Sequence, residues 1–369
     1  MIATPVKIEF LEKGHETLWD EYVLRNRQGT LYHLSGWRRA IEKAYGHRSY
    51  SLVALRASTD PSGKRRREIV GGLPLIHLRP FLFGNVLISL PFCDFAGIIA
   101  DNGTIETELL RRALQLAREL RCRVVELRHL SPHIALSEGE DPCGEGPARI
   151  VTRQHKVRML REVAASAEDL MRSFKAKLRS QIRRPVKDGL YAVVGEIELL
   201  DDFYDVFARN MRDLGSPVHS KQFIKAVSEE LSERSKFVIV YHGRKPLACS
   251  MMIGCGDTLE NPWASALHQY SRMSPNMLLY WKMLEYACDN GYAYFDFGRS
   301  SQGEGTYRFK EQWGARPSPL YWSYILTGRF SVPGEVEGKG RQIATACWRR
   351  LPVPITRFMG PPIRKHIGL

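Results

Sequence analysis

The sequence predicts an α/β fold made of two copies of one domain, each a mostly antiparallel mixed sheet flanked by helices. Its 369 residues exceed the length typical of a single domain. The order strand, turn, strand, strand, helix, strand occurs twice along the chain, and Glu126 and Asp296 hold equivalent places in the two repeats. Internal duplication of this kind indicates two similar domains. Two unrelated α+β domains are the alternative interpretation.

The first copy is expected over residues 1–155. A helix is predicted around residues 36–45, strands over 51–55 and 71–78, and a closing strand over 123–128. Between the strands, a further helix is indicated by apolar residues spaced three and four apart, namely Leu109, Ala113, Leu116, Ala117 and Leu120. The segment 139–147, rich in glycine, proline and acidic residues, is expected to be a surface loop near the domain boundary.

One apolar stretch, residues 80–100, requires a choice between a membrane-spanning helix and buried strands. Its only formal charge is Asp94. A spanning helix needs about 20 apolar residues, but here glycine, asparagine and proline interrupt the stretch. We therefore predict two short buried strands.

The N-terminus and the cysteines predict a cytoplasmic chain. The first residues lack the apolar core of a signal peptide. The seven cysteines include no Cys-x-x-Cys pair, which favours a reduced chain without a structural metal.

The second copy is expected over residues 156–330, followed by a basic, proline-containing tail over 331–369. Its elements are predicted as helices around 200–214, 221–231 and 276–290 and strands over 237–241, 246–254, 263–267 and 292–297. An antiparallel run of strands that leads into a helix and a returning strand is the order of the GNAT-like acetyltransferase fold. The fold class is therefore predicted as tandem GNAT-like domains.

A basic segment opens this second copy. Residues 153–187 contain eleven lysines and arginines against three acidic residues, in a chain with a net charge of +14. One helix is predicted to keep Leu170, Phe174, Leu178 and Ile182 on its buried face. The exposed cations are either a solvated helix face or a surface for a phosphate-rich ligand. The polyanion-binding candidates are Lys177, Arg179, Arg183, Arg184 and Lys187.

The stretch 292–315 is richest in residues that can do chemistry. Asp296 ends an apolar strand, and Gly298 permits a sharp turn after it. Asp296 is either half of a structural ion pair or a group of the reaction. Lys310 follows among aromatic residues, where it is either a surface side chain or a fixed cation that stabilises an oxyanion.

A second candidate stretch is residues 263–276, in which His268, Tyr270 and Arg272 precede a helix start at Ser274–Pro275. Helix starts bind anions, whereas a histidine such as His268, taken alone, is more often a hydrogen-bonded structural residue than a base. Ser-Pro-Asn stands where CoA-dependent acetyltransferases have a glycine-rich phosphate loop. No P-loop, dinucleotide fingerprint, serine elbow or His-Glu-x-x-His motif is present.

Three motifs carry a family resemblance: LRSQIRRPVKDGL, YFDFGRSS and TYRFKEQWG. Over about residues 30–326 the chain resembles the FemAB-type tandem-GNAT aminoacyltransferases of peptidoglycan bridges. Within them it is most similar to the FemAB-related proteins of exopolysaccharide and PEP-CTERM (exosortase) loci. The sequence departs from the peptidoglycan enzymes at Ile41 after the first-domain tryptophan, at His219–Lys221 and at His129–Leu130.

The resemblance implies transfer of an aminoacyl group from aminoacyl-tRNA to an amine, with a role in cell-envelope or exopolysaccharide assembly. It places Phe309 and Lys310 on the family's Phe-Lys pair, whose lysine stabilises the reacting acyl group. With Asp296 these are the catalytic candidates. The substrate-binding candidates are Arg299, Ser300, Tyr307, Trp263, His268, Tyr270, Arg272, Asn276 and Trp37.

The leading functional hypothesis is therefore an acyltransferase without a metal or a bound cofactor. Its acyl donor is aminoacyl-tRNA or acyl-CoA as a co-substrate, and its acceptor is an amine-bearing envelope or polysaccharide precursor. The alternatives are an acyl-CoA-dependent N-acyltransferase and a non-catalytic envelope or polysaccharide assembly factor with the same fold.

The tail after residue 340 combines six lysines and arginines with interleaved apolar residues and has no acidic residue. Prolines at positions 352, 354, 361 and 362 exclude one long helix. Such a segment can lie on the anionic inner face of the cytoplasmic membrane. A strap packed on the first domain is the alternative.

Overall fold

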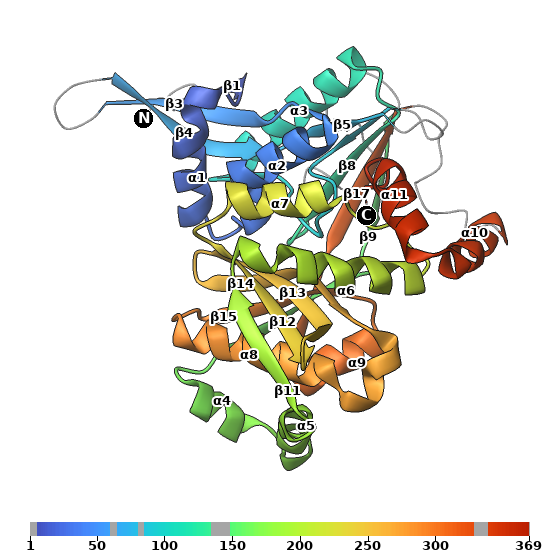
Figure 1. Ribbon diagram of the computed structural model, residues 1–369. Helices are drawn as coiled ribbons and strands as arrows, with labels where there is room; N and C mark the ends of the chain where they lie inside the picture. The colour runs from blue at the N-terminus through green and yellow to red at the C-terminus, as the bar shows by residue number, and fades with distance from the viewer. Residues whose placement is uncertain (1–5, 60–64, 80–84, 134–147, 328–338, 369) are drawn as a thin grey trace. The chain divides into compact units, whose positions relative to one another are not determined.

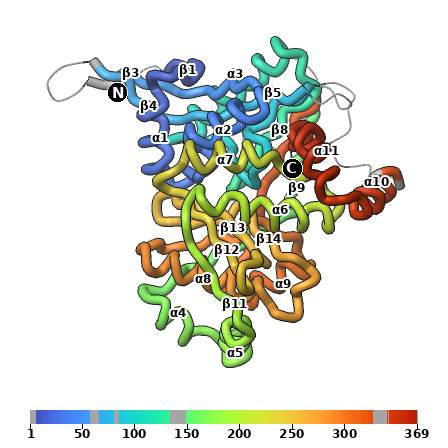
Figure 2. Tube along the Cα trace, viewed as in Figure 1, coloured from blue at the N-terminus to red at the C-terminus, as the bar shows by residue number. Residues whose placement is uncertain are grey.

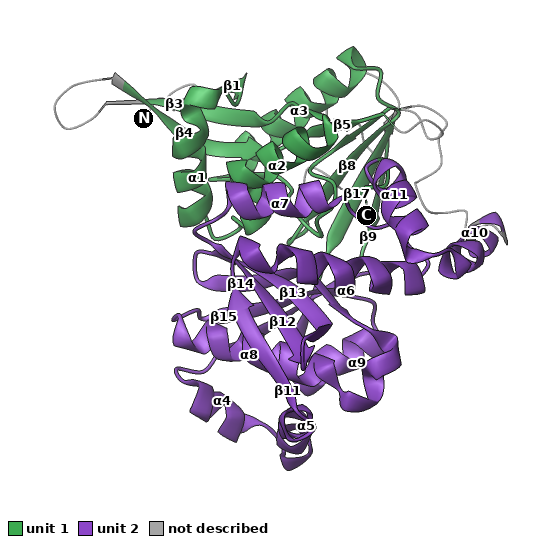
Figure 3. Cartoon of the chain, in the orientation of Figure 1, with its two compact units in different colours: residues 1–155, 319–336, 366–369 green, residues 156–318, 337–365 purple. Residues whose placement is uncertain are grey.

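The structure is a computed structural model that describes residues 6–59, 65–79, 85–133, 148–327 and 339–368 (Figure 1). The chain forms two compact units (Figure 3). Unit 1 contains Met1–His155, Pro319–Val336 and His366–Leu369, and unit 2 contains Lys156–Ser318 and Glu337–Lys365. The predicted loop at residues 139–147 lies outside the described residues.

Unit 1 consists of two sheets and three α-helices. Its helices are α1 (Glu16–Arg25), α2 (Ser35–Tyr45) and α3 (Gly103–Glu119). One sheet has the order β1 (Val6–Phe10), β3 (Leu52–Thr59), β4 (Arg65–Leu73), β7 (Ile99–Ala100). The other has the order β2 (Arg48–Ser49), β5 (Ile76–Leu78), β6 (Val86–Ile88), β8 (Val124–His129), β17 (Tyr321–Thr327), β9 (Ala148–Arg153). The predicted strands within residues 80–100 correspond to β6 and β7, and no helix among the described residues is long and apolar enough to cross a membrane.

Helix α3 shows how the sequence determines these elements. The side chain of Asn102 accepts a hydrogen bond from the amide of Ile105 at 3.1 Å and so caps the first turn. Leu109, Ala113 and Leu116, at the predicted helical spacing, are buried in the core of unit 1. The chain leaves the helix at Leu120 and continues into β8.

Unit 2 is built on one seven-stranded sheet. Its order is β11 (Leu190–Gly195), β12 (Ser235–His242), β13 (Lys245–Cys255), β14 (Thr258–Ala266), β15 (Tyr294–Ser300), β10 (Val157–Glu162), β16 (Arg316–Pro319). The helices are α4 (Ala167–Ser173), α5 (Ala176–Lys187), α6 (Leu200–Asp213), α7 (Lys221–Glu230), α8 (Pro275–Asp289), α9 (Gly305–Gln312), α10 (Lys339–Arg350) and α11 (Val353–Arg364).

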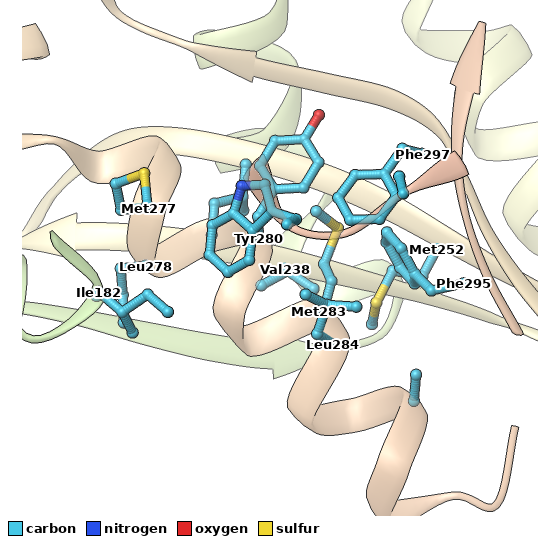
Figure 4. Close-up of a cluster of buried hydrophobic side chains, with 14 of the residues drawn as sticks. Ile182, Val238, Met252, Met277, Leu278, Tyr280, Met283, Leu284, Phe295 and Phe297 are labelled. Atoms are coloured by element: carbon cyan, nitrogen blue, oxygen red, sulfur yellow. The ribbon is translucent and has the colours of Figure 1, made fainter. Parts of the chain in front are cut away.

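The core of unit 2 lies between α8 and the sheet. Met283 and Leu284 of α8 are fully buried, and Tyr280 stacks on Phe297 of β15 with ring centroids 5.5 Å apart (Figure 4). Phe295, also on β15, belongs to the same cluster. Burial of this aromatic and aliphatic surface is the main stabilising contribution to the unit.

The predicted duplication is confirmed by the sheet registers. In unit 1, β6 pairs in parallel with β8 and places Ile88 opposite Glu126. In unit 2, β14 pairs in parallel with β15 and places Glu260 opposite Asp296. In each unit, therefore, two parallel strands are separated along the chain by a helix, and the second strand carries an acidic residue at the matching position.

Three expectations need correction. The single basic helix is two helices, because Phe174 and Lys175 have extended backbones between α4 and α5, although all four predicted apolar residues are buried. Strand β17 was expected in the second domain, but it pairs with β8 and β9 and completes the sheet of unit 1. The tail was expected as a separate region, but α10 and α11 belong to unit 2, where they pack against α6, and His366–Leu369 belong to unit 1 (Figure 2).

Candidate functional site

The central strands of unit 2 separate at one point. Pairing of β14 with β15 covers Thr258–Glu260 and Tyr294–Asp296 and then stops, although β14 continues to Ala266 and β15 to Ser300. Beyond Glu260 and Asp296 the two strands are no longer paired with each other, so the groups of this part of the sheet come from strands that separate.

A β-bulge lies where the divergence begins. Met251 of β13 faces Trp263, but Ile253 faces Glu260, so β14 has one extra residue between them. The extra residue falls at Asn261–Pro262. Bulges bend a strand and re-aim its side chains, and they are frequent next to active sites.

Two buried polar atoms at the divergence have no hydrogen-bond partner among the described residues. They are the side-chain oxygen Oδ1 of Asn261 on β14 and the hydroxyl Oγ of Ser300 at the end of β15. Asn261 is 5% exposed and Ser300 4%. Buried polar groups are nearly always hydrogen-bonded, so these two atoms on the separating strands make this part of unit 2 a candidate site for a ligand.

Lys310 lies beside the end of β15. It is in α9, is 8% exposed, and donates a hydrogen bond from Nζ to the carbonyl oxygen of Arg299 at 2.7 Å. This contact fixes the ammonium group at the position where β15 ends. A buried, held cation of this kind can stabilise negative charge that develops on a substrate oxygen.

Asp296 is fully buried and both of its oxygens are engaged. Arg158 of β10 donates from Nε to Oδ2, and the amide of Gly298 donates to Oδ1 at 2.8 Å. Gly298 has a φ of 70°, the left-handed conformation that glycine adopts without strain. The geometry therefore gives Asp296 the role of holding β10 and the turn after β15, and the sequence alone did not identify Arg158 as its partner.

Aromatic rings pack together along the second half of α9. Phe309 lies 5.0 Å from Tyr280 and 6.2 Å from Trp313, measured between ring centroids. Burial raises the pKa of Tyr280 to about 12, and a hydrogen bond from Asn261 lowers it by a smaller amount. Tyr280 therefore remains protonated at neutral pH and can act as a hydrogen-bond donor. Sequence reasoning placed Tyr280 only in the core of α8.

The candidate residues before α8 and in its first turn are mostly exposed. Ser274 precedes the helix with a φ of 52°, and Pro275 is its first residue. His268 and Arg272, in the 3₁₀ helix before it, are exposed, as is Asn276. The ring of Tyr270 lies 4.9 Å from the ammonium of Lys245. No contact joins His268 to Arg272 among the described interactions of this segment.

The two predicted tryptophans lie in separate surroundings. Trp263 of β14 is 9% exposed and packs 5.8 Å from the ring of Phe223 and 6.0 Å from that of His219. Trp37 is in unit 1, where it is fully buried with its ring 4.8 Å from Tyr32. Trp37 therefore has a packing role in the core of unit 1.

The predicted cations of α5 are mostly at the surface. Lys177, Arg183, Arg184 and Lys187 are exposed. Arg184 pairs with Asp188 at 3.6 Å, and Arg179 is half-buried and donates to the carbonyl of Phe174 at 3.1 Å. Arg179 thus caps the end of α4, whereas the other four present charge to solvent.

Residues 172–311 match the family model described as the acetyltransferase (GNAT) domain. This match covers most of unit 2, including the bulge, the divergence and Lys310. A comparison with curated proteins gave no match.

Several solved structures share the whole architecture. A crystal structure of FemX has a TM-score of 0.62 at 14% identity, covering 86% of this chain and 96% of that one. A tandem GNAT protein from the clavulanic acid biosynthesis pathway has a TM-score of 0.53 at 11% identity, covering 89% and 100%. The fold is a tandem of GNAT-like units. The structure of L-PGS from Bacillus licheniformis is also similar, with a TM-score of 0.53 at 11% identity, covering 95% and 100%.

Proposed function

We propose that the chain is an acyltransferase that moves an acyl group from an activated ester or thioester to an amine, at the divergence of β14 and β15. The observation that carries this proposal is the pair of unpartnered buried polar atoms on the two strands, Asn261 Oδ1 and Ser300 Oγ, together with the ammonium of Lys310 held on the carbonyl of Arg299, the residue before Ser300. The match of residues 172–311 to the GNAT domain supports it.

The roles of these groups follow from the chemistry of acyl transfer. The amine nitrogen attacks the carbonyl carbon, a C–N bond forms, and the C–O or C–S bond to the leaving group breaks. The carbonyl oxygen becomes negative in the transition state, and Lys310 stabilises that charge. The proton lost by the amine ends on the departing oxygen or sulfur. Asn261 Oδ1 can accept a hydrogen bond from the amine, while the protonated Tyr280 can donate one to the leaving group.

The residues around the divergence bind and orient the substrates in this proposal. Ser300 and Arg299, at the end of β15, contact the acyl group, and Phe309 and Tyr307 of α9 provide an apolar wall. Asp296 is a positioning residue, because its oxygens are taken by Arg158 and Gly298. Orientation of two substrates in one site supplies much of the rate of such a reaction.

The residues around the start of α8 would contact the substrate at some distance from the reaction. His268, Tyr270, Arg272 and Asn276 lie ahead of or within the first turn of α8 and can contact the parts of a substrate far from the reacting bond. Trp263 lies on β14 beyond the bulge, among Phe223 and His219, and can contribute an apolar contact there.

We favour aminoacyl-tRNA as the donor. Pro275 at the first position of α8 removes one of the backbone N–H groups that would hold a pyrophosphate. The exposed cations of α5 instead offer a surface for a nucleic-acid backbone. Acyl-CoA is the second candidate, because the matched domain model is that of acetyltransferases.

The acceptor we propose is an amine on an envelope or exopolysaccharide precursor. The fold shared with FemX is compatible with a FemAB-like assignment. The subgroup we propose, the FemAB-related proteins of exopolysaccharide loci, rests on the three sequence motifs alone. Among the described residues, no group of three or more His, Cys, Asp or Glu side chains could hold a metal ion.

The donor can be tested directly with purified protein and radiolabelled donors. Total charged tRNA, acetyl-CoA and longer acyl-CoA would each be mixed with a panel of amine acceptors, and N-acyl products counted. Transfer from charged tRNA is expected. Ser300→Ala should lower kcat/KM about tenfold without loss of stability, because the hydroxyl it removes has no partner in the fold. Transfer from no donor would favour a non-catalytic assembly factor.

A further inference from the structure

The last helix of the chain carries its apolar side chains on the solvent side. In α11, Ile355 is 41% exposed, Phe358 83%, Met359 44% and Ile363 38%. Their spacing of three, one and four residues places them on one face of the helix. We call these four residues the α11 stripe.

The opposite face of α11 attaches the helix to unit 2 through small and charged residues. Thr356 and Gly360 are buried, and a Cβ added at Gly360 would lie 3.0 Å from the amide nitrogen of Val218. Arg357 pairs with Asp205 of α6 at 2.5 Å. Arg364 donates from Nε to Nε2 of His219 at 3.0 Å.

This arrangement reverses the ordinary amphipathic helix of a soluble protein, which buries its apolar face and exposes its charges. A strap that only covers α6 would gain stability by burying Phe358 and Ile355. The Arg357–Asp205 ion pair and the close packing of Gly360 on Val218 instead turn the opposite face of α11 toward unit 2, so the stripe faces solvent.

The tail that carries the stripe is basic. From Gly338 to the end of the chain there are seven lysines and arginines and no acidic residue. The neighbouring helix α10 adds Ile343, which is 63% exposed, and the exposed Arg349 and Arg350. Arg357 is paired with Asp205, whereas Arg349 and Arg350 lie exposed near the stripe. An apolar stripe with exposed cations near it is complementary to a surface that has an apolar interior and anionic headgroups.

We propose that α10 and α11 form an interfacial anchor that lies on an anionic lipid surface, with the α11 stripe inserted among the acyl chains and the arginines at the phosphate groups. Basic residues near such a surface add electrostatic attraction, and the inserted side chains add the burial of their apolar surface. The proposal does not depend on the acyltransferase assignment, because it involves none of the residues at the β14–β15 divergence.

Flotation with liposomes tests the anchor on the full-length chain. Vesicles of phosphatidylcholine with 30% phosphatidylglycerol, about a typical anionic fraction, and vesicles of phosphatidylcholine alone would be compared at low and high salt. The native chain is expected to float with the anionic vesicles, less so in high salt. Phe358→Asp should lower the bound fraction by about tenfold.

A matched control exists in unit 2. Ile355 in the stripe and Ile197 in the 3₁₀ helix before α6 are both 41% exposed. Ile355→Asp should weaken flotation, whereas Ile197→Asp should leave it unchanged. Circular dichroism of each variant shows whether the fold is retained.

Three results would overturn the anchor. The native chain could fail to float, the two isoleucine variants could float equally well, or Phe358→Asp could dissociate a dimer in analytical ultracentrifugation without changing flotation. The last result would assign the stripe to contact between two copies of the chain.

Discussion

Buried carboxylates in the two units are held by arginines. Asp296 is paired with Arg158, and Glu126 is paired with Arg128 through Oε1 at 2.6 and 2.8 Å. Both acids stand at the matching position of the parallel strand pair, but Arg158 comes from the neighbouring strand β10 and Arg128 from the same strand as Glu126, so what repeats is a buried acid held by an arginine. This repetition supports a positioning role for Asp296 over a role in the reaction itself.

Replacing Asp296 should therefore affect stability. Asp296→Ala leaves Arg158, whose side chain is 16% exposed, without its carboxylate. Loss of one partner of a buried pair typically costs about 3–5 kcal/mol, and the lower end is expected here. The free energy of unfolding in urea measures this. Asp289→Ala, at an exposed position of α8, is the control and should change stability by less than about 0.5 kcal/mol. An Asp296→Ala protein that is inactive but fully stable would instead return Asp296 to the reaction.

Helix α5 presents most of its cations to solvent. Its apolar residues Leu178 and Ile182 are buried against unit 2, so its exposed cations have a fixed arrangement. A fixed row of cations releases counterions when it binds a polyanion, and the affinity then falls steeply with salt.

Charge reversal in α5 should weaken binding of tRNA. Arg183→Glu with Arg184→Glu is expected to reduce affinity more than tenfold at low salt and to flatten the salt dependence. Arg66→Glu with Arg67→Glu, two adjacent exposed arginines of unit 1, changes the net charge equally and serves as the control. Filter binding of labelled tRNA over a range of salt concentrations measures both. Equal losses in the two double variants would show that only the overall charge matters.

The contact of α11 with His219 predicts a dependence of stability on pH. Burial, with a smaller effect of Arg364, lowers the pKa of His219 well below its usual 6.5. The folded chain therefore favours the neutral ring, which accepts the hydrogen bond from Arg364, while the unfolded chain takes up a proton near pH 6.5. This contribution to stability is complete above about pH 6.5 and decreases as the pH falls below it.

His219→Gln removes this titration while it keeps an acceptor for Arg364. Between pH 6.5 and 5, the free energy of unfolding of the native chain should fall more steeply than that of the variant, by up to about 1.4 kcal/mol per pH unit. Urea unfolding at several pH values measures the difference. The buried histidines of unit 1 titrate in both proteins and cancel in the comparison. Parallel curves would rule out His219 as the source.

At the scale of the whole molecule, the order of the chain does not follow the division into units. Strand β17 comes after all the strands of unit 2 but lies between β8 and β9 of unit 1. Ile325 and Leu326 of β17 are fully buried there, and Trp322 donates from Nε1 to the carbonyl of Asp94 at 3.0 Å. Unit 1 is thus incomplete without a segment that lies more than 150 residues later in the sequence.

A fragment of residues 1–155 should consequently fail to fold on its own. It lacks the strand that joins β8 to β9, and the two edges left behind expose unpaired backbone groups. Circular dichroism and urea unfolding of the fragment test this, and a second fragment with residues 319–327 attached through a flexible linker is the control that should recover structure. Cooperative unfolding of residues 1–155 alone would contradict the assignment of β17.

The sequence was sufficient for the features that depend on local pattern. The periodic apolar residues of α3 and α8 and the repeated order of elements predicted the tandem fold. Features that depend on pairing between distant segments were not predictable: the ion pair of Arg158 with Asp296, β17 in unit 1, and the bulge at Asn261 all depend on which strands pair and in what register. The break between α4 and α5 was missed because the apolar spacing continues across Phe174, although its backbone does not.

The most direct test of the proposed chemistry is the turnover of a Lys310→Ala variant in the donor assay. Loss of a group that stabilises an oxyanion typically lowers kcat by about 10² or more. Lys236→Ala, which removes a partly buried lysine paired with Glu196 in the same unit, should retain activity. We predict a kcat reduced at least 100-fold, roughly the effect of one lost oxyanion donor, with an unchanged circular dichroism spectrum. A folded Lys310→Ala protein with native kcat would contradict the assignment of this site.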